Sequence, residues 1–137
     1  MRPLPLLAVL GSAVALPAAV MLAACSSSSL RIVQSDSPKP SGMEAVFQGA
    51  MIVDDNGCVQ ARTPANTLVT LVWPRGYSVR GDSKSFEVLD GNKNVVARSG
   101  ATLAIGGGGA DAFQDAWTER DCAGGGKLWM VGKVDTA

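Results

Sequence analysis

The sequence predicts a mainly β protein with a single domain, built either as a small antiparallel barrel or as a small β-sandwich. From residue 43 onward, short apolar segments alternate with Gly, Asn, Asp and Pro at intervals of about ten residues, which is typical of a small all-β domain. Removal of the apolar first 24 residues leaves 113 of the 137, enough for one modest hydrophobic core and too few for two.

Residues 1–24 resemble a bacterial lipoprotein export signal. Arg2 precedes a mostly apolar run, an arrangement that favours export of the chain that follows. The run closes on a four-residue box, Leu22, Ala23, Ala24 and Cys25. In the lipoprotein family the cysteine of this box receives a diacylglyceryl group and becomes the new amino terminus, so the resemblance implies lipidation of Cys25. Two acyl chains, such as palmitate, are enough for stable anchoring.

Two other interpretations of this segment are open. Its apolar residues are numerous enough to remain as an uncleaved membrane anchor, and the small residues near position 24 also suit an ordinary signal peptidase. We favour lipidation, because Pro17 breaks a helix and Arg2 is the single basic residue before the run. The expected location is therefore the exported face of the cell membrane, with the membrane itself as a partner through lipidated Cys25.

Residues 25–42 are predicted to form a flexible tether, and residues 43–137 the β domain. The tether is rich in Ser and Pro and offers almost nothing to bury. Residues 30–33 are apolar enough to begin a strand, but polar residues flank them, so we expect them to belong to the tether. Such a tether would hold the domain off the bilayer.

Seven segments of the domain are predicted strands. The strongest is residues 67–73, which is mostly β-branched or apolar and ends at Pro74, a residue without a ladder donor; we expect it to lie centrally. Asn56 and Gly57 suit the tight turn after the first strand, and the turn at residues 90–92 suits a second hairpin. The predicted strands are residues 45–53, 58–61, 67–73, 85–89, 94–98, 101–105 and 127–134.

One short helix is predicted at residues 111–120. Phe113, Ala116 and Trp117 recur there at helical spacing and would form one apolar face. Glycines precede it at residues 106–109 and follow it at residues 124–126. Because glycine adopts conformations that other residues avoid, we expect both runs to be flexible connections.

Cys58 and Cys122 are predicted to form a disulfide. Once Cys25 is assigned to the lipid, they are the two remaining cysteines, and an exported compartment permits disulfides. Closing a loop of this length stabilises a small domain by about 4 kcal/mol in the chain-entropy model. A metal site or two free thiols are the alternatives, but a tetrahedral site would need two carboxylates as further ligands.

The chain contains no histidine, which disfavours an enzyme. Its absence removes the commonest general base and the catalytic triads that depend on one. Paired carboxylates could run a hydrolase, but most of the acidic residues fall in predicted turns or on solvated faces. We therefore expect no catalytic residues and keep a carboxylate-dependent hydrolase acting on an envelope polymer as the alternative function.

Composition and motifs also predict no cofactor, no metal and no nucleic-acid partner. Eleven basic and twelve acidic residues follow position 24, so the basic footprint of a nucleic-acid-binding domain is missing. The glycines at residues 106–109 lack the Gly-Lys-Ser/Thr ending of a phosphate loop. The acidic and amide pattern that begins at Asp90 lacks the glycine and glutamate that a calcium loop requires.

Trp73, Arg75 and Tyr77 are the candidate binding surface. They lie at the end of the predicted central strand, and they combine large apolar area with polar groups that can grip a ligand. The alternative is that Trp73 fills the core, which leaves Arg75 and Tyr77 as the exposed pair. The tripeptide at residues 80–82, Arg-Gly-Asp, resembles an integrin ligand, but chance is the better explanation, because a turn between strands fully explains Gly81.

The order of several short motifs resembles a group of small secreted or lipid-anchored proteins of actinobacteria. The resemblance covers most of residues 45–134 and implies a barrel similar to the oligonucleotide/oligosaccharide-binding (OB) fold, with no assigned activity. The motifs are Gly49, Asn56-Gly57-Cys58, Leu71-Val72-Trp73-Pro74, Gly76-Tyr77, Val88-Leu89-Asp90, Val95-Val96-Ala97, Gly106-Gly107-Gly108 and Cys122. The expected function is a non-catalytic binding or structural module of the cell envelope, whose partner is an envelope protein or a small ligand.

Overall fold

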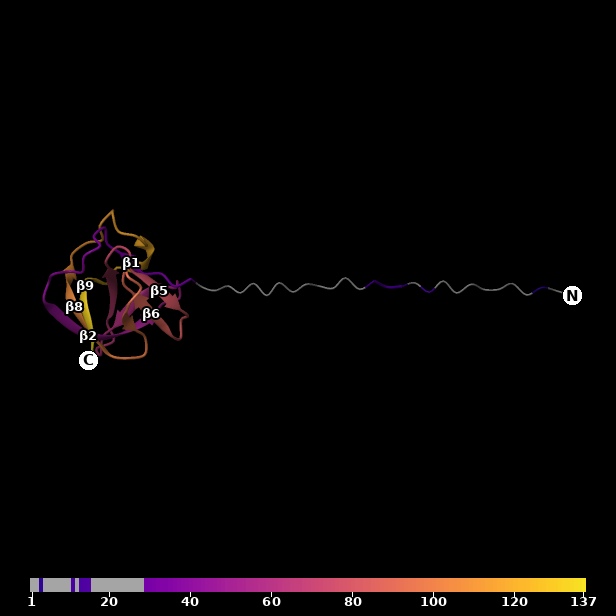
Figure 1. Ribbon diagram of the computed structural model, residues 1–137, viewed down its shortest axis with the longest axis horizontal. Coiled ribbons are helices and arrows are strands. Elements are labelled where there is room, and N and C mark those ends of the chain that lie inside the picture. Colours follow the sequence, from indigo (N-terminus) through magenta and orange to yellow (C-terminus); the bar gives the residue numbers. More distant parts are fainter. Residues whose placement is uncertain (1–2, 4–10, 12, 16–28) are drawn as a thin grey trace.

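The computed structural model describes residues 3, 11, 13–15 and 29–137 (Figure 1). Cys25 and nearly all of the predicted export signal, residues 1–24, lie outside the described residues. Among the residues described, no helix has the length and apolar character needed to cross a membrane.

Five strands close into a small barrel, as predicted, and the alternative of a β-sandwich is wrong. The barrel strands are β2 (Ala45–Val53), β3 (Val59–Arg62), β4 (Leu68–Trp73), β8 (Leu103–Ala110) and β9 (Lys127–Thr136). Each has a neighbour on both sides in the order β4-β3-β2-β8-β9, and pairing of β9 with β4 closes the ring. Four junctions are antiparallel, whereas β4 and β9 run parallel, so the barrel is not purely antiparallel.

Strand β4 lies between two hydrophobic clusters, which explains its continuous apolar sequence. Leu71 and Trp73 point into the barrel and pack with residues such as Ile105 and Val131. Val72 points outward and packs with Trp117 in a second cluster on the outside of the barrel. The expected central position of this strand is therefore confirmed, because both of its faces are covered.

The segment before β2 belongs to the domain, contrary to the predicted tether. Residues 33–34 form a short strand, β1 (Val33–Gln34), that pairs in parallel with the end of β4. Val33 is fully buried, and Ile32 and Ser35 are also buried. Farther along, the Ser41 N–H donates to the Val131 carbonyl at 3.1 Å. This segment packs on the domain although polar residues flank it, because the backbone of β4 and β9 supplies its hydrogen-bond partners.

A second, three-stranded sheet is inserted between β4 and β8. Its strands are β5 (Ser78–Gly81), β6 (Phe86–Leu89) and β7 (Val95–Arg98), in that spatial order. Strand β5 was not among the predicted strands. Phe86, Val88 and Ala97 of this sheet share the inner core with Trp73. In Figure 1, β5 and β6 lie on the opposite side of the domain from β8 and β9.

The glycines at residues 106–109 are part of strand β8 and not a flexible connection. Gly107 has a φ of 136°, and the pairing of β8 with β9 changes register between Ile105 and Gly107. A Cβ atom on Gly107 would collide with the Met130 carbonyl oxygen of β9, and one on Gly106 would lie 2.7 Å from the Lys133 oxygen. Glycine is needed here because the bulge brings two backbones very close.

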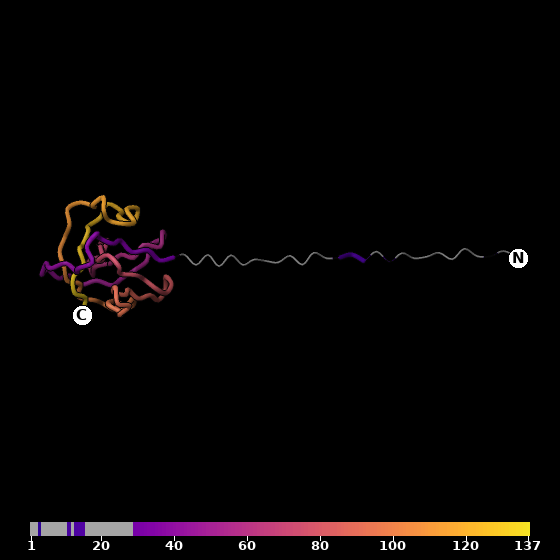
Figure 2. The backbone as a smooth tube through the Cα atoms, turned by 45° about the horizontal axis from the view of Figure 1, so that its top comes forward, coloured from indigo at the N-terminus to yellow at the C-terminus, as the bar shows by residue number. Residues whose placement is uncertain are grey.

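The predicted helix at residues 111–120 does not form. The β8–β9 connection is a loop, drawn in orange at the top of Figure 2, whose helical part is one 3-10 turn, η1 (Arg120–Cys122). Phe113 and Trp117 nevertheless contact each other edge to face, with ring centroids 5.2 Å apart. Forming the first turn of a short helix is unfavourable in free energy, so the apolar spacing alone does not make this segment helical. Glu119, with a φ of 57°, interrupts any helical path before η1, which ends at the disulfide-bonded Cys122.

Candidate functional site

The three residues of the predicted binding surface do not share one face. Trp73 is 1% exposed and lies in the core. The prediction that it belongs to a binding surface is therefore wrong, and the alternative, that it fills the core, is confirmed. Arg75 is exposed, but its guanidinium donates to the Ser35 carbonyl at 2.8 Å and to the Ala116 carbonyl at 3.1 Å. Arg75 therefore ties the segment before β2 to the β8–β9 loop.

Tyr77 and Trp73 both line a pocket of about 480 Å³ at the end of β4. The two rings are tilted, with centroids 6.1 Å apart. Burial, and to a smaller extent the charge of Asp90, raises the pKa of the Tyr77 phenol. The Trp73 indole N–H has no acceptor among the described residues, but it is shielded from solvent. A ligand in this pocket would therefore not reach it.

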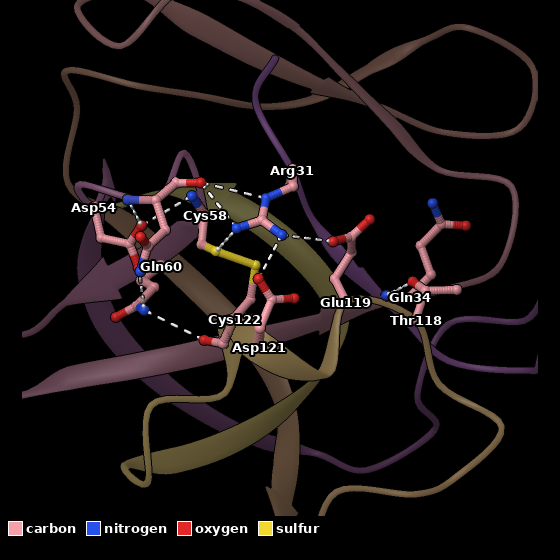
Figure 3. Close-up of a disulfide and its surroundings, with 10 residues drawn as sticks. Arg31, Gln34, Asp54, Cys58, Gln60, Thr118, Glu119, Asp121 and Cys122 are labelled. Carbon is pink, nitrogen blue, oxygen red and sulfur yellow. Dashed lines mark hydrogen bonds and ion pairs between the residues drawn. A yellow bond between two sulfur atoms is a disulfide. The ribbon is translucent and has the colours of Figure 1, made fainter. Parts of the chain in front are cut away.

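The predicted disulfide is present and joins two loops of the barrel (Figure 3). Cys58 follows the β2–β3 turn and Cys122 ends η1, with their Cα atoms 5.5 Å apart. Asp54 orders the turn by accepting hydrogen bonds from the backbone N–H groups of Asn56 and Cys58 at 2.9 and 3.0 Å. The sulfurs are thus occupied, which excludes both the free-thiol and the metal alternatives for this pair.

Arg31 clamps the segment before β2 against both of these loops. One guanidinium nitrogen donates to Glu119 at 2.9 Å and to Asp121 at 2.6 Å, and another donates to the Asn56 carbonyl at 2.9 Å. The hydrogen bond from Arg31 lowers the pKa of the Asp121 carboxyl. Oxygens of Glu119 and Asp121 also approach the Cys122 sulfur, but the carboxylates serve Arg31 and the sulfur serves the disulfide. This cluster is therefore a clamp and not a metal site.

Asp121→Asn is expected to make the urea midpoint of unfolding less sensitive to acid. A carboxyl whose pKa is lower in the folded chain stabilises the fold above its ordinary pKa of 3.8, and loses that contribution as the pH falls through the lower, folded-state pKa. The measurement is urea unfolding followed by tryptophan fluorescence from about pH 5 to pH 2. Asp55→Asn, at an exposed position of the β2–β3 turn, is the matched control. Identical acid profiles for parent and Asp121→Asn would contradict the assigned role of the clamp.

Other carboxylates also have structural roles. Glu87 lies between Arg80 and Arg98, at 3.0 and 2.8 Å, and hydrogen bonds first from Arg98 and then from Arg80 lower its pKa. Asp82 accepts backbone hydrogen bonds from Lys84 and Ser85 and shapes the β5–β6 turn. Arg80 and Gly81 end strand β5, Arg80 pairs with Glu87, and Asp82 begins the turn. Each residue of the tripeptide therefore has a structural role, although Gly81 lies in a strand and not in the predicted turn.

A second pocket lies at the mouth of the barrel, and we call it the mouth pocket. It has a volume of about 490 Å³, within the usual size range of small-molecule sites, and barrel mouths commonly hold such sites. The starts of β2, β4 and β9, the end of β8 and the β3–β4 loop surround it. Its lining residues are Phe47, Thr63, Thr67, Val69, Gly109, Ala110, Asp111, Lys127, Leu128 and Trp129.

Two aromatic rings are held firmly in the mouth pocket. Phe47 and Trp129 meet edge to face, with centroids 4.8 Å apart and planes at 79°. The Trp129 indole N–H donates to the Gly106 carbonyl at 3.1 Å, which fixes the ring orientation. Both side chains are half-buried, so each keeps some surface for a ligand. Sequence patterns did not single them out, because aromatic residues in predicted strands are usually core residues.

Much of the outer face of β3 and β4 is covered. Val72 packs there with Val33, Trp117 and the disulfide, all of which are buried, whereas Arg62 and Leu68 on the same two strands are exposed. The covered part of this face is closed to a ligand, and the mouth pocket is open to solvent.

No protein-family model, curated protein or solved structure matches this chain significantly. The function is therefore argued from the residues and their geometry alone.

Proposed function

We propose that this protein is a lipid-anchored, non-catalytic binding module of the cell envelope that takes its ligand in the mouth pocket. The observation that carries the proposal is the mouth pocket itself, in which a rigid aromatic pair, Phe47 and Trp129, lies open to solvent at the end of a closed barrel. A few polar groups on an apolar, preformed wall are the usual composition of a binding site.

The anchoring part of the proposal is supported by two features far apart in the chain. The four-residue box that ends at Cys25 resembles the lipoprotein signal. The bond between Cys58 and Cys122 suits an oxidising, exported compartment, because disulfides are rare in proteins that stay in the cytosol. Both features favour the same location.

The non-catalytic part is supported by what surrounds the carboxylates. Asp54 and Asp82 hold turns, while Glu87, Glu119 and Asp121 are paired with arginines. A paired carboxylate is poorly suited to give or take a proton near neutral pH. The mouth pocket contains one carboxylate, Asp111, whereas glycoside hydrolysis needs two flanking the bond that is cleaved.

One experiment tests anchoring and binding together. The full chain is expressed with the photo-crosslinking residue p-benzoylphenylalanine in place of Thr67, membranes are irradiated, and the intact mass is measured. We expect a chain that begins at Cys25, carries a diacylglyceryl group, has lost two hydrogens to the disulfide, and shows an adduct after irradiation. The same residue in place of Asn92, exposed between β6 and β7, is the control and is expected to give no such adduct.

A second variant, Cys25→Ser, separates the two parts of the proposal. Its mass is expected to lack the lipid while the disulfide remains. An uncleaved parent chain with free thiols would overturn the anchoring assignment. Equal adducts from positions 67 and 92, or none from either, would overturn the binding assignment.

A further inference from the structure

One wall of the mouth pocket is aromatic. Trp129 supplies the larger ring, and its orientation is fixed twice, by Phe47 at 4.8 Å and by the hydrogen bond to the Gly106 carbonyl. Val69 extends this apolar surface at the start of β4. A ligand that fits here has a flat face made of C–H groups or an aromatic ring.

The rim of the pocket carries hydrogen-bonding groups of both kinds. Thr63 and Thr67 bring hydroxyls, which both donate and accept, while Asp111 accepts and Lys127 donates. The β3–β4 loop that carries the threonines is ordered: the Thr63 hydroxyl accepts from the Thr67 N–H at 3.1 Å, and the Asn66 N–H donates to the Thr63 carbonyl at 2.8 Å. A ligand bound between them has polar groups around its edge that donate as well as accept.

The charges of the rim cancel. Asp111 and Lys127 are the two charged residues among those that line the pocket, one of each sign. A phosphate-bearing ligand would meet the Asp111 carboxylate together with the Lys127 ammonium. Repulsion by the carboxylate would offset attraction by the ammonium, so charge would add little to the affinity. A peptide added as an extra strand needs an unpaired sheet edge, whereas every barrel strand has a neighbour on both sides.

We propose that the mouth pocket binds a neutral saccharide, with the C–H face of one sugar ring against Trp129 and its hydroxyls toward Thr63, Thr67, Asp111 and Lys127. A sugar ring has the required combination of an apolar face and edge hydroxyls that donate and accept, and it carries no charge. The proposal rests on the mouth pocket being the binding site, and it adds the class of ligand.

Titration of the full, lipidated chain with three neutral sugars, cellotriose, maltotriose and chitotriose, tests this assignment. The detergent must lack a sugar headgroup, because such a headgroup would compete. Tryptophan fluorescence reports on the pocket directly: Trp129 is half-buried, whereas Trp73 and Trp117 are 1% and 8% exposed. We expect a saturable change with at least one sugar, with a dissociation constant of about 1 mM.

Variants identify the site. Thr67→Val removes a hydroxyl, and Asp111→Asn replaces one carboxylate oxygen by an NH2 group and removes the charge. Each is expected to weaken binding about fivefold. Trp129→Phe keeps an aromatic ring but reduces its area and loses the bond to Gly106, and is expected to weaken binding about tenfold. Because this variant lacks the reporting tryptophan, its binding is measured by ligand-observed NMR. Thr102→Val and Asp55→Asn are exposed matched controls outside the pocket and are expected to bind like the parent. Urea unfolding of each variant confirms that it is folded.

Two results would overturn the saccharide assignment. One is the absence of a saturable change with all three sugars, and the other is equal sugar binding by the parent, Thr67→Val and Asp111→Asn. If the sugars fail while position 67 still gives a peptide or lipid adduct, the binding function stands and the ligand class is wrong. If the sugars fail and position 67 gives no adduct, both proposals are wrong.

Discussion

Gly107→Ala is expected to lower the free energy of unfolding by about 3 kcal/mol or more. Gly107 has a φ of 136°, which a residue with a Cβ atom rarely adopts, and the added atom would collide with the Met130 carbonyl. The collision is between two backbones in a closed ring, so no side-chain rotation relieves it. The measurement is urea unfolding followed by tryptophan fluorescence and circular dichroism.

Gly109→Ala is the matched control in the same strand. Its nearest contact would be the Leu128 carbonyl at 3.9 Å, an ordinary van der Waals distance, and it has no positive φ. We expect a change within about 1 kcal/mol of the parent, because alanine also restricts the unfolded chain. Equal losses for the two variants would show that β8 needs glycine for some reason other than the bulge at Gly107.

Removal of the disulfide is expected to have the other large effect. The double variant Cys58→Ser and Cys122→Ser opens a loop with a sequence separation of 64 residues, which costs about 4 kcal/mol in the chain-entropy model. Small domains retain only about 5–15 kcal/mol in total, so much of the stability is lost. The β8–β9 loop, without a helix of its own, is expected to loosen first.

Urea unfolding with and without a reductant measures this effect. The reduced parent and the double serine variant are expected to share one midpoint, because both lack the same covalent link. A double variant that unfolds within about 1 kcal/mol of the oxidised parent would mean that Arg31, Arg75 and the outer cluster hold the loop without the disulfide.

Local chemistry was enough to predict most of the barrel strands. β2 (Ala45–Val53) has the predicted limits, because Asn56 and Gly57 fix the turn after it. β4 (Leu68–Trp73) ends where predicted, because Pro74 stops it, and it begins one residue later than predicted. The disulfide followed from the two cysteines that remain once Cys25 is assigned to a lipid, in a chain that the sequence predicts to be exported. In each case a residue close in the sequence, or a simple count, carries the signal.

The wrong predictions share one physical cause, which is contact between segments far apart in the sequence. The glycines at residues 106–109 are a strand because β9 approaches them closely. Residues 111–120 keep apolar contacts without a helix because Trp117 packs under the segment that contains Val33. Residues 30–42 are ordered because β4 and β9 offer them backbone partners. No local pattern contains this information.

The mouth pocket also depends on distant contacts. Phe47 and Trp129 lie 82 positions apart in the sequence and become neighbours only when β8 pairs with β2 on one side and β9 on the other. Thr63 and Thr67 carry no motif of their own. The predicted site at Trp73 failed because a strand-terminal tryptophan serves the core as readily as a surface.

The early start of the domain limits how far an anchored molecule would stand from a bilayer. Leu30 enters beside the β2–β3 turn, where the Arg31 N–H donates to the Gly57 carbonyl at 2.8 Å. Five residue steps separate Leu30 from Cys25 and reach at most about 18 Å when fully extended. The mouth pocket lies toward the other end of β2, since Phe47 is near its start and the turn follows its last residue, Val53. If Cys25 carries a lipid, the β2–β3 turn would lie within about 18 Å of that anchor, at the end of β2 opposite the mouth pocket.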